Sequence, residues 1–214
     1  MKNYIKLLIT AIAATILFMV LSTSAHAAEK YLFYMHGAQV KDANDPKAKV
    51  YVAIVEDLQK SGFNVTFELH PSDVGDNEAA AKAYAAKIAT QIKGLIYAGT
   101  PPENITVAGF SLGSTIAAIT SGLVGNAKVN YVLLAGCANK PAVPMTVDYS
   151  RMKGHILAVT EASDPGYGTC VGRLPDGINY QEVNLSTGKG HATFRLPEYL
   201  SLWMDPLVEW TKNN

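Results

Sequence analysis

Residues 105–119 read ITVAGFSLGSTIAAI, and three local signals follow one another in this stretch. The β-branched run at 105–108 predicts a buried strand, and the residues after it predict a helix. Between the two, Gly109 and Gly113 flank Ser111 in a match to the pattern G-x-S-x-G. A serine on so sharp a turn has a strained positive φ, and the glycines avoid collisions across the turn. The stretch therefore predicts a strand, an exposed serine and a helix; the alternative is an ordinary helix start with Ser111 as its N-cap.

Short β-branched or aromatic runs alternate with longer segments of helical period from Lys30 onward. This alternation is typical of an α/β fold, with a mainly parallel sheet of about six strands and helices on both faces. We expect strands at residues 31–35, 64–69, 105–110, 129–135, 156–160 and 178–183. We expect four helices: one with a face at Val50, Ile54 and Leu58 that ends at Gly62, one at 77–98, one at 112–123, and one that begins at Pro197 and that Pro206 kinks or divides. The long irregular stretches 136–153 and 161–177 follow strands, so both lie at the carboxyl edge, where open α/β folds bind ligands.

The amino-terminal segment has a composition of its own. Lys2 and Lys6 precede an almost uniformly apolar stretch at 7–21, and Ala25-His26-Ala27 offers the small residues that a signal peptidase reads. We therefore predict a signal peptide at 1–27, cleaved near Ala27, and a single domain at 28–214 that is secreted or periplasmic. A retained membrane anchor is the alternative, but the apolar stretch is shorter than the roughly 20 residues that span a bilayer. No stable membrane insertion of the mature chain is expected.

The charge of the mature part indicates which classes of partner to expect. It holds 16 basic and 18 acidic side chains, and no run of Lys and Arg interleaves with aromatic residues. Nucleic acid is therefore not an expected partner. Because no electrostatic funnel is evident, we expect substrate recognition to depend on pocket shape and apolar contact. The sequence has neither a P-loop nor a G-x-G-x-x-G motif, and neither a CxxC pair nor a Cys/His zinc cluster, so no cofactor and no metal are expected.

The two cysteines, Cys137 and Cys170, both lie in the mature part. Two thiols in an exported chain tend to form one disulfide, so we predict a Cys137–Cys170 bond. Two buried thiols are the alternative.

A serine nucleophile needs a base within hydrogen-bond reach, and the mature chain has four histidines. His155 precedes its strand and lies at the wrong edge of the sheet, whereas His36 and His70 end the first two strands. His191 follows the last strand in a glycine-rich stretch that can bring the imidazole over Ser111. His191 is the predicted base, against the alternative of a surface histidine in a glycine turn.

The base in turn needs a carboxylate to orient it. Asp164 stands in an Asp-Pro-Gly turn just beyond the strand at 156–160. Aspartate favours such turns without any catalytic role, and Glu161 is a rival carboxylate at the end of the same strand. Asp164 is the predicted partner of His191.

The serine turn and the chain order Ser111, Asp164, His191, each after a successive strand, resemble the α/β-hydrolase superfamily over nearly the whole mature chain. There is no room before Tyr31 for the two antiparallel strands that usually open this fold, and no lid insertion lies within 136–153. The resemblance therefore implies a minimal, lidless core, as in cutinase-like enzymes.

The resemblance also implies an oxyanion hole. In that superfamily a His-Gly pair after an early strand opens the oxyanion loop, and His36-Gly37 match it. The two backbone N–H donors would then be those of Leu112 and Ala38, with His36 as a structural loop histidine and Gln39 as a possible assistant.

Together these residues predict an exported serine hydrolase that cleaves small-molecule carboxylic esters through a Ser-His-Asp triad and an acyl-enzyme. The same triad would also suit a thioesterase, an amidase or peptidase, an acyltransferase or a lipase, and the fold could carry a non-catalytic binding module. The pocket walls are expected from loops 38–48, 70–77, 136–153 and 165–177, which include Tyr149, Tyr167 and Met145.

Overall fold

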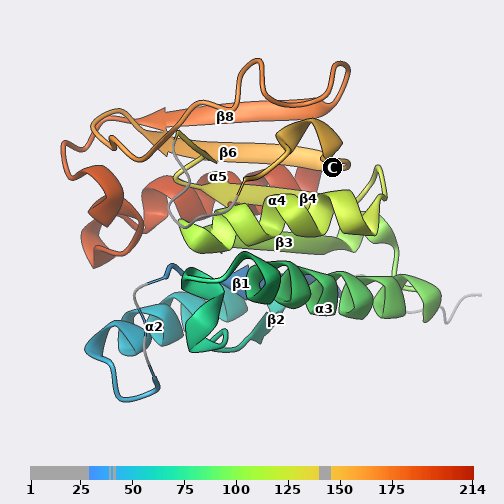
Figure 1. Cartoon of the computed structure of the whole chain (residues 1–214), viewed down its shortest axis with the longest axis horizontal. Coiled ribbons are helices and arrows are strands. Elements are labelled where there is room, and N and C mark those ends of the chain that lie inside the picture. The colour runs from blue at the N-terminus through green and yellow to red at the C-terminus, as the bar shows by residue number, and fades with distance from the viewer. Residues whose placement is uncertain (1–28, 39, 41, 140–145) are drawn as a thin grey trace, which may run out of the picture.

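The computed structural model describes residues 29–38, 40, 42–139 and 146–214 (Figure 1). The predicted signal peptide at 1–27 lies outside the described residues, as do Gln39 and Met145. No helix within the described ranges is both long enough and apolar enough to cross a membrane.

A six-stranded sheet forms the centre of the molecule, in the order β2-β1-β3-β4-β6-β8, and every neighbouring pair is parallel. Its strands are β1 (Lys30–Met35), β2 (Phe63–Phe67), β3 (Ile105–Phe110), β4 (Asn130–Leu134), β6 (His155–Glu161) and β8 (Asn179–Leu185). All residues of β3 and β4 are buried, as expected for central strands covered on both faces. The predicted α/β class and the six parallel strands are confirmed, with strand ends shifted by one or two residues.

Helices cover both faces of this sheet. Helices α3 (Glu78–Tyr97) and α4 (Leu112–Val124) bury their apolar sides on one face, and α2 (Pro46–Lys60) and α5 (Ser201–Asn213) on the other (Figure 1). Strand β1 shows the alternation that feeds both layers: Phe33 packs with the α3 and α4 cluster, and Leu32 and Tyr34 pack with the α2 and α5 cluster.

The closing helix differs from the prediction. Residues Pro197–Tyr199 form a 3-10 turn, and α5 begins only at Ser201. Pro206 lies inside α5 without dividing it. The N–H that proline lacks would bond the carbonyl of Leu202, which lies on the exposed side of the helix and can be solvated.

The two irregular stretches after β4 and β6 meet in a small antiparallel ladder that the sequence did not predict. Strand β5 (Cys137–Ala138) pairs with β7 (Tyr167–Gly168), and the Cys137–Cys170 disulfide lies beside them. Two-residue strands carry too few positions for an alternating pattern, so only the disulfide was foreseeable. The ladder lies at the carboxyl edge of the sheet, next to the serine turn.

Candidate active site

Ser111 stands on a strained turn between β3 and α4. Its φ is 58° and its ψ is −117°, a conformation that L-residues rarely adopt. A Cβ on Gly109 would lie 2.0 Å from the carbonyl oxygen of Gly113, so the first glycine avoids a collision across the turn. A Cβ on Gly113 would lie 2.1 Å from the carbonyl oxygen of Met35, so the second glycine makes room for β1 instead. The Ser111 side chain makes no capping hydrogen bond, which argues against the simple N-cap interpretation.

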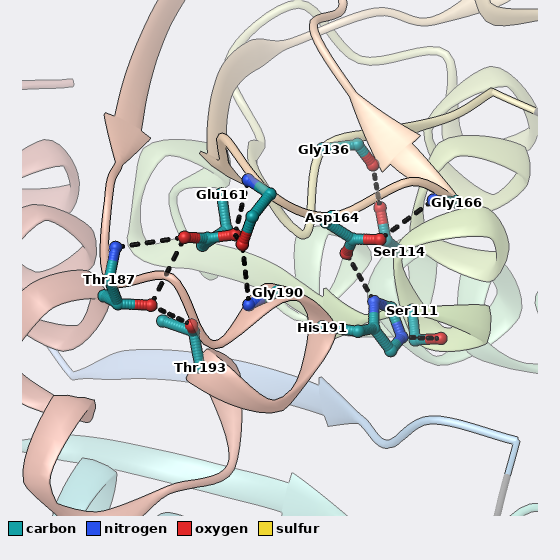
Figure 2. Close-up of polar contacts among 11 residues, drawn as sticks. Ser111, Ser114, Gly136, Glu161, Asp164, Gly166, Thr187, Gly190, His191 and Thr193 are labelled. Atoms are coloured by element: carbon teal, nitrogen blue, oxygen red, sulfur yellow. Dashed lines mark hydrogen bonds and ion pairs between the residues drawn. The ribbon is translucent and has the colours of Figure 1, made fainter.

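The structure brings Ser111, His191 and Asp164 into one hydrogen-bonded chain (Figure 2). His191 Nε2 lies 2.8 Å from Ser111 Oγ, and His191 Nδ1 lies 2.6 Å from Asp164 Oδ2. The other carboxylate oxygen of Asp164 accepts the N–H of Gly166 at 3.0 Å. The Asp164 side chain is only 2% exposed and that of His191 is 31% exposed, so the carboxylate is shielded while the imidazole remains accessible. With Nδ1–H donated to the carboxylate, Nε2 is free to accept the serine proton.

Each of the three side chains follows a different strand of the parallel sheet. Ser111 follows β3, Asp164 lies on the loop after β6, and His191 lies in the 3-10 turn Gly190–Phe194 after β8. The imidazole packs against two aromatic rings, with ring-centre distances of 4.8 Å to Phe110 and 5.1 Å to Tyr167. These contacts restrict the rotation of the imidazole and keep it over the serine.

Glu161, the rival carboxylate, does not face the imidazole. It is 2% exposed and accepts five hydrogen bonds from two loops; those from Thr187 are drawn in Figure 2. Its Oε2 accepts from the N–H and hydroxyl of Ser163 at 2.7 and 2.6 Å, and its Oε1 accepts from the N–H and hydroxyl of Thr187 at 3.0 and 3.3 Å and from the N–H of Gly188 at 3.0 Å. Burial favours the neutral acid, but the hydrogen bonds outweigh it and lower the pKa of Glu161.

Glu161 thereby joins the loop that carries Asp164 to the loop that carries His191. Ser163 Oγ strengthens the joint, because it also accepts the N–H of Gly190 at 3.1 Å. The two carboxylates thus differ in position: one contacts His191, and the other holds the two loops together.

Of the two N–H groups predicted for an oxyanion hole, one belongs to Leu112, directly after the serine, and the other to Ala38 in the loop after β1. The first hydrogen bond of α4 runs from the N–H of Thr115 to the carbonyl of Ser111 at 3.2 Å. The N–H of Leu112 lies before this bond and therefore has no acceptor within the helix. Ala38 and Gly37 line the same cavity as Ser111.

His36 fixes the peptide that bears the Ala38 N–H. Its Nδ1 lies 2.6 Å from the carbonyl oxygen of Gly37, and its Nε2 accepts the N–H of His70 at 3.2 Å. Nδ1 therefore carries the proton and donates it to Gly37. The Gly37 carbonyl and the Ala38 N–H belong to one planar peptide unit, so holding one orients the other. Burial, with a smaller contribution from His70, lowers the pKa of His36 to about 4, which keeps the ring neutral near neutral pH.

A cavity of about 330 Å³ opens beside Ser111. Its lining residues are Gly37, Ala38, Tyr51, Phe110, Ser111, Asp164, Pro165, Gly166, Tyr167, His191 and Arg195. Tyr167 lines it as predicted, but Tyr149 does not, because its hydroxyl accepts the N–H of Ala138 and its ring stacks under Arg173.

Two residues of the cavity wall, Tyr51 and Arg195, were not predicted from the sequence. In the sequence, Tyr51 looks like one more residue of the apolar face of α2. The only sequence signal for Arg195 was its position four residues after His191.

No group of three or more His, Cys, Asp or Glu side chains that could hold a metal ion occurs in the described ranges.

Solved structures with the same fold include several α/β hydrolases. SOBER1 from Arabidopsis thaliana superposes with a TM-score of 0.55 at 16% identity, over 87% of this chain and 99% of that chain. A dienelactone hydrolase from Anabaena variabilis gives 0.59 at 13% identity, over 88% of each chain. A phospholipase/carboxylesterase from Dyadobacter fermentans gives 0.52 at 16% identity, over 86% of this chain and 91% of that chain. No protein-family model and no curated protein matches the sequence. The chain therefore has the α/β-hydrolase fold.

Proposed function

We propose that the protein is an exported serine hydrolase that cleaves small carboxylic esters. The observation that carries the proposal is the continuous path from Asp164 through His191 to Ser111, which ends at a strained serine beside a cavity. The solved structures named above include a dienelactone hydrolase and a phospholipase/carboxylesterase, which favours ester chemistry on this fold.

The proposed reaction proceeds by two acyl transfers. His191 Nε2 takes the proton of Ser111 as Oγ attacks the ester carbonyl carbon, and Asp164 stabilises the imidazolium that forms. The N–H groups of Leu112 and Ala38 receive the developing oxyanion. His191 then gives its proton to the departing alkoxide, which leaves an acyl-serine and a free alcohol. Water, deprotonated by the same imidazole, then attacks the acyl carbon; the bond from that carbon to Oγ breaks, the imidazolium returns the proton to Oγ, and the acid leaves.

Export is part of the proposal. It is supported by the pattern at residues 1–27 and by the Cys137–Cys170 disulfide, since such bonds persist in oxidising compartments.

Hydrolysis of p-nitrophenyl acetate by the purified mature protein tests the proposal. Ser111→Ala should retain its fold and lose hydrolysis to near background. Ser201→Ala, an exposed serine at the start of α5, is the matched control and should retain full activity. Unchanged hydrolysis by Ser111→Ala would contradict the proposal, because the proposed path has no nucleophile other than Ser111.

A further inference from the structure

Arg195 places a positive charge on the wall of the cavity beside Ser111. It ends the 3-10 turn that carries His191, and its N–H bonds the carbonyl of Ala192 at 2.9 Å. Its guanidinium carbon lies 5.7 Å from the ring centre of Phe110, the same ring that packs against His191. Arg195 and the imidazole therefore both lie against one aromatic side chain and both line the cavity beside Ser111.

The charge of Arg195 has no carboxylate to balance it among the described residues. None of their carboxylates lies within ion-pair distance of the guanidinium. Its Nε is buried and has no hydrogen-bond partner in the described part of the chain. Asp164, the other formally charged side chain on the described cavity wall, is already bonded to His191 and Gly166. A half-buried cation without a counter-ion is costly, and an anionic ligand removes that cost.

Tyr51 adds a second polar group at the same place. The residue is 1% exposed, it lines the cavity, and its hydroxyl lies 3.1 Å from the position that a Cβ on Gly37 would take. Burial raises the pKa of Tyr51, and the charge of Arg195, together with hydrogen bonds to the hydroxyl from the Gly37 backbone and the Arg195 side chain, only partly offsets this. The phenol therefore remains a neutral group that can donate a hydrogen bond next to the guanidinium.

We propose that Arg195, assisted by Tyr51, binds a carboxylate of the substrate, so that the preferred substrates are small esters that carry a carboxylate a few bonds from the scissile carbonyl. This inference rests on the proposed ester hydrolysis at Ser111. The planar guanidinium fork matches a carboxylate, and a cavity of about 330 Å³ accommodates a short dicarboxylic acid monoester. The near-neutral charge of the whole chain does not reveal this preference, because one local cation produces it.

The test compares two p-nitrophenyl esters of equal chain length, the adipate monoester, which ends in a carboxylate, and the hexanoate, which ends in a methyl group. For Arg195→Met, we expect the ratio of kcat/KM, adipate over hexanoate, to fall by about 10- to 100-fold relative to the unaltered protein. Arg195→Lys keeps the charge without the fork and should give an intermediate ratio. Arg151→Met removes an exposed arginine of another loop and should leave the ratio unchanged. An Arg195→Met ratio within twofold of the unaltered protein overturns the inference while leaving the proposed hydrolysis intact.

Binding gives a readout that does not need turnover. Monomethyl adipate is titrated calorimetrically into Ser111→Ala and into the double variant Ser111→Ala/Arg195→Met. At least tenfold weaker binding by the double variant supports the carboxylate site. If this weaker binding is found but the unaltered protein hydrolyses no ester, the hydrolase proposal is refuted and the carboxylate site stands. Equal binding by the two variants overturns the carboxylate site.

Discussion

Replacing Glu161 by Gln should destabilise the protein, because the buried carboxylate has no acceptor to spare. Its Oε1 accepts the N–H groups of Thr187 and Gly188, and its Oε2 accepts the N–H of Ser163. A glutamine at this position has one oxygen and one NH2 group. Whichever way the amide turns, its NH2 group faces at least one of these backbone N–H donors, which then lacks an acceptor.

The magnitude follows from these contacts. One or two unsatisfied buried donors, each costing about 1–3 kcal/mol, together with the loss of charge-assisted bonds, give a decrease of about 2–4 kcal/mol in the free energy of unfolding. For a domain of this size, that corresponds to a fall in Tm of roughly 5–15 °C. Thermal and urea unfolding, followed by circular dichroism near neutral pH, measure both quantities. Glu198→Gln, at an exposed position on the turn before α5, is the matched control and should change the free energy by less than about 0.5 kcal/mol.

The pH dependence of this difference is also fixed in sign. The pKa of Glu161 in the folded protein is below its usual value of 4.5, so the stabilisation is complete above that pH and is lost as the pH falls through the lower folded pKa. The gap between the unaltered protein and Glu161→Gln should therefore close only in acid. Turnover by folded Glu161→Gln should remain well above that of Asp164→Asn, which should lose roughly 10³- to 10⁴-fold. A Glu161→Gln variant as stable as Glu198→Gln, or one whose turnover falls as far as that of Asp164→Asn, would refute this division of roles.

Three further predictions concern the turn, the disulfide and the early loop. Gly109→Ala places a Cβ 2.0 Å from a backbone oxygen and should lower the free energy of unfolding by more than about 4 kcal/mol. Gly94→Ala in α3, where no atom lies within 4 Å of the new Cβ, should raise it by about 0.5–1 kcal/mol. Urea denaturation distinguishes the two variants, and equal stabilities would contradict the steric account. The denatured, unreduced mature protein should titrate close to zero thiols, and reduction of Cys137–Cys170 should lower stability by about 3–4 kcal/mol; two free thiols would disprove the bond. Because the pKa of His36 is about 4 when folded, the unfolded chain takes up this proton first, and stability should fall as the pH drops from about 6.5 towards 4; an NMR titration midpoint for His36 near 6.5 would contradict this.

Much of the fold was predictable because its determinants are local. The turn at Ser111 depends on a positive φ and on two glycines that contact nearby backbone, and both show in five consecutive residues. The positions of Asp164 and His191 follow from where strands β6 and β8 end, since parallel strands bring their carboxyl ends to one edge.

The rest of the site depends on contacts between distant elements. Tyr51 lines the cavity from a helix on the face of the sheet, and Arg195 lines it from the turn after β8, close to the ring of Phe110. Neither contact leaves a periodic or motif signal. Glu161 remained a rival because sequence places it only three residues from Asp164, whereas the structure keeps it in the β6 ladder opposite Leu185 and turns it towards the loops.

Covalent labelling by a fluorophosphonate probe shows directly whether Ser111 is the nucleophile, because the probe reacts preferentially with an activated serine. Mass spectrometry of the mature protein should find one adduct per chain, on Ser111. Ser111→Ala should give no adduct, and His191→Ala should react far more slowly, since the serine would lose its base. The absence of an adduct, or an adduct on another serine, would contradict the proposed nucleophile.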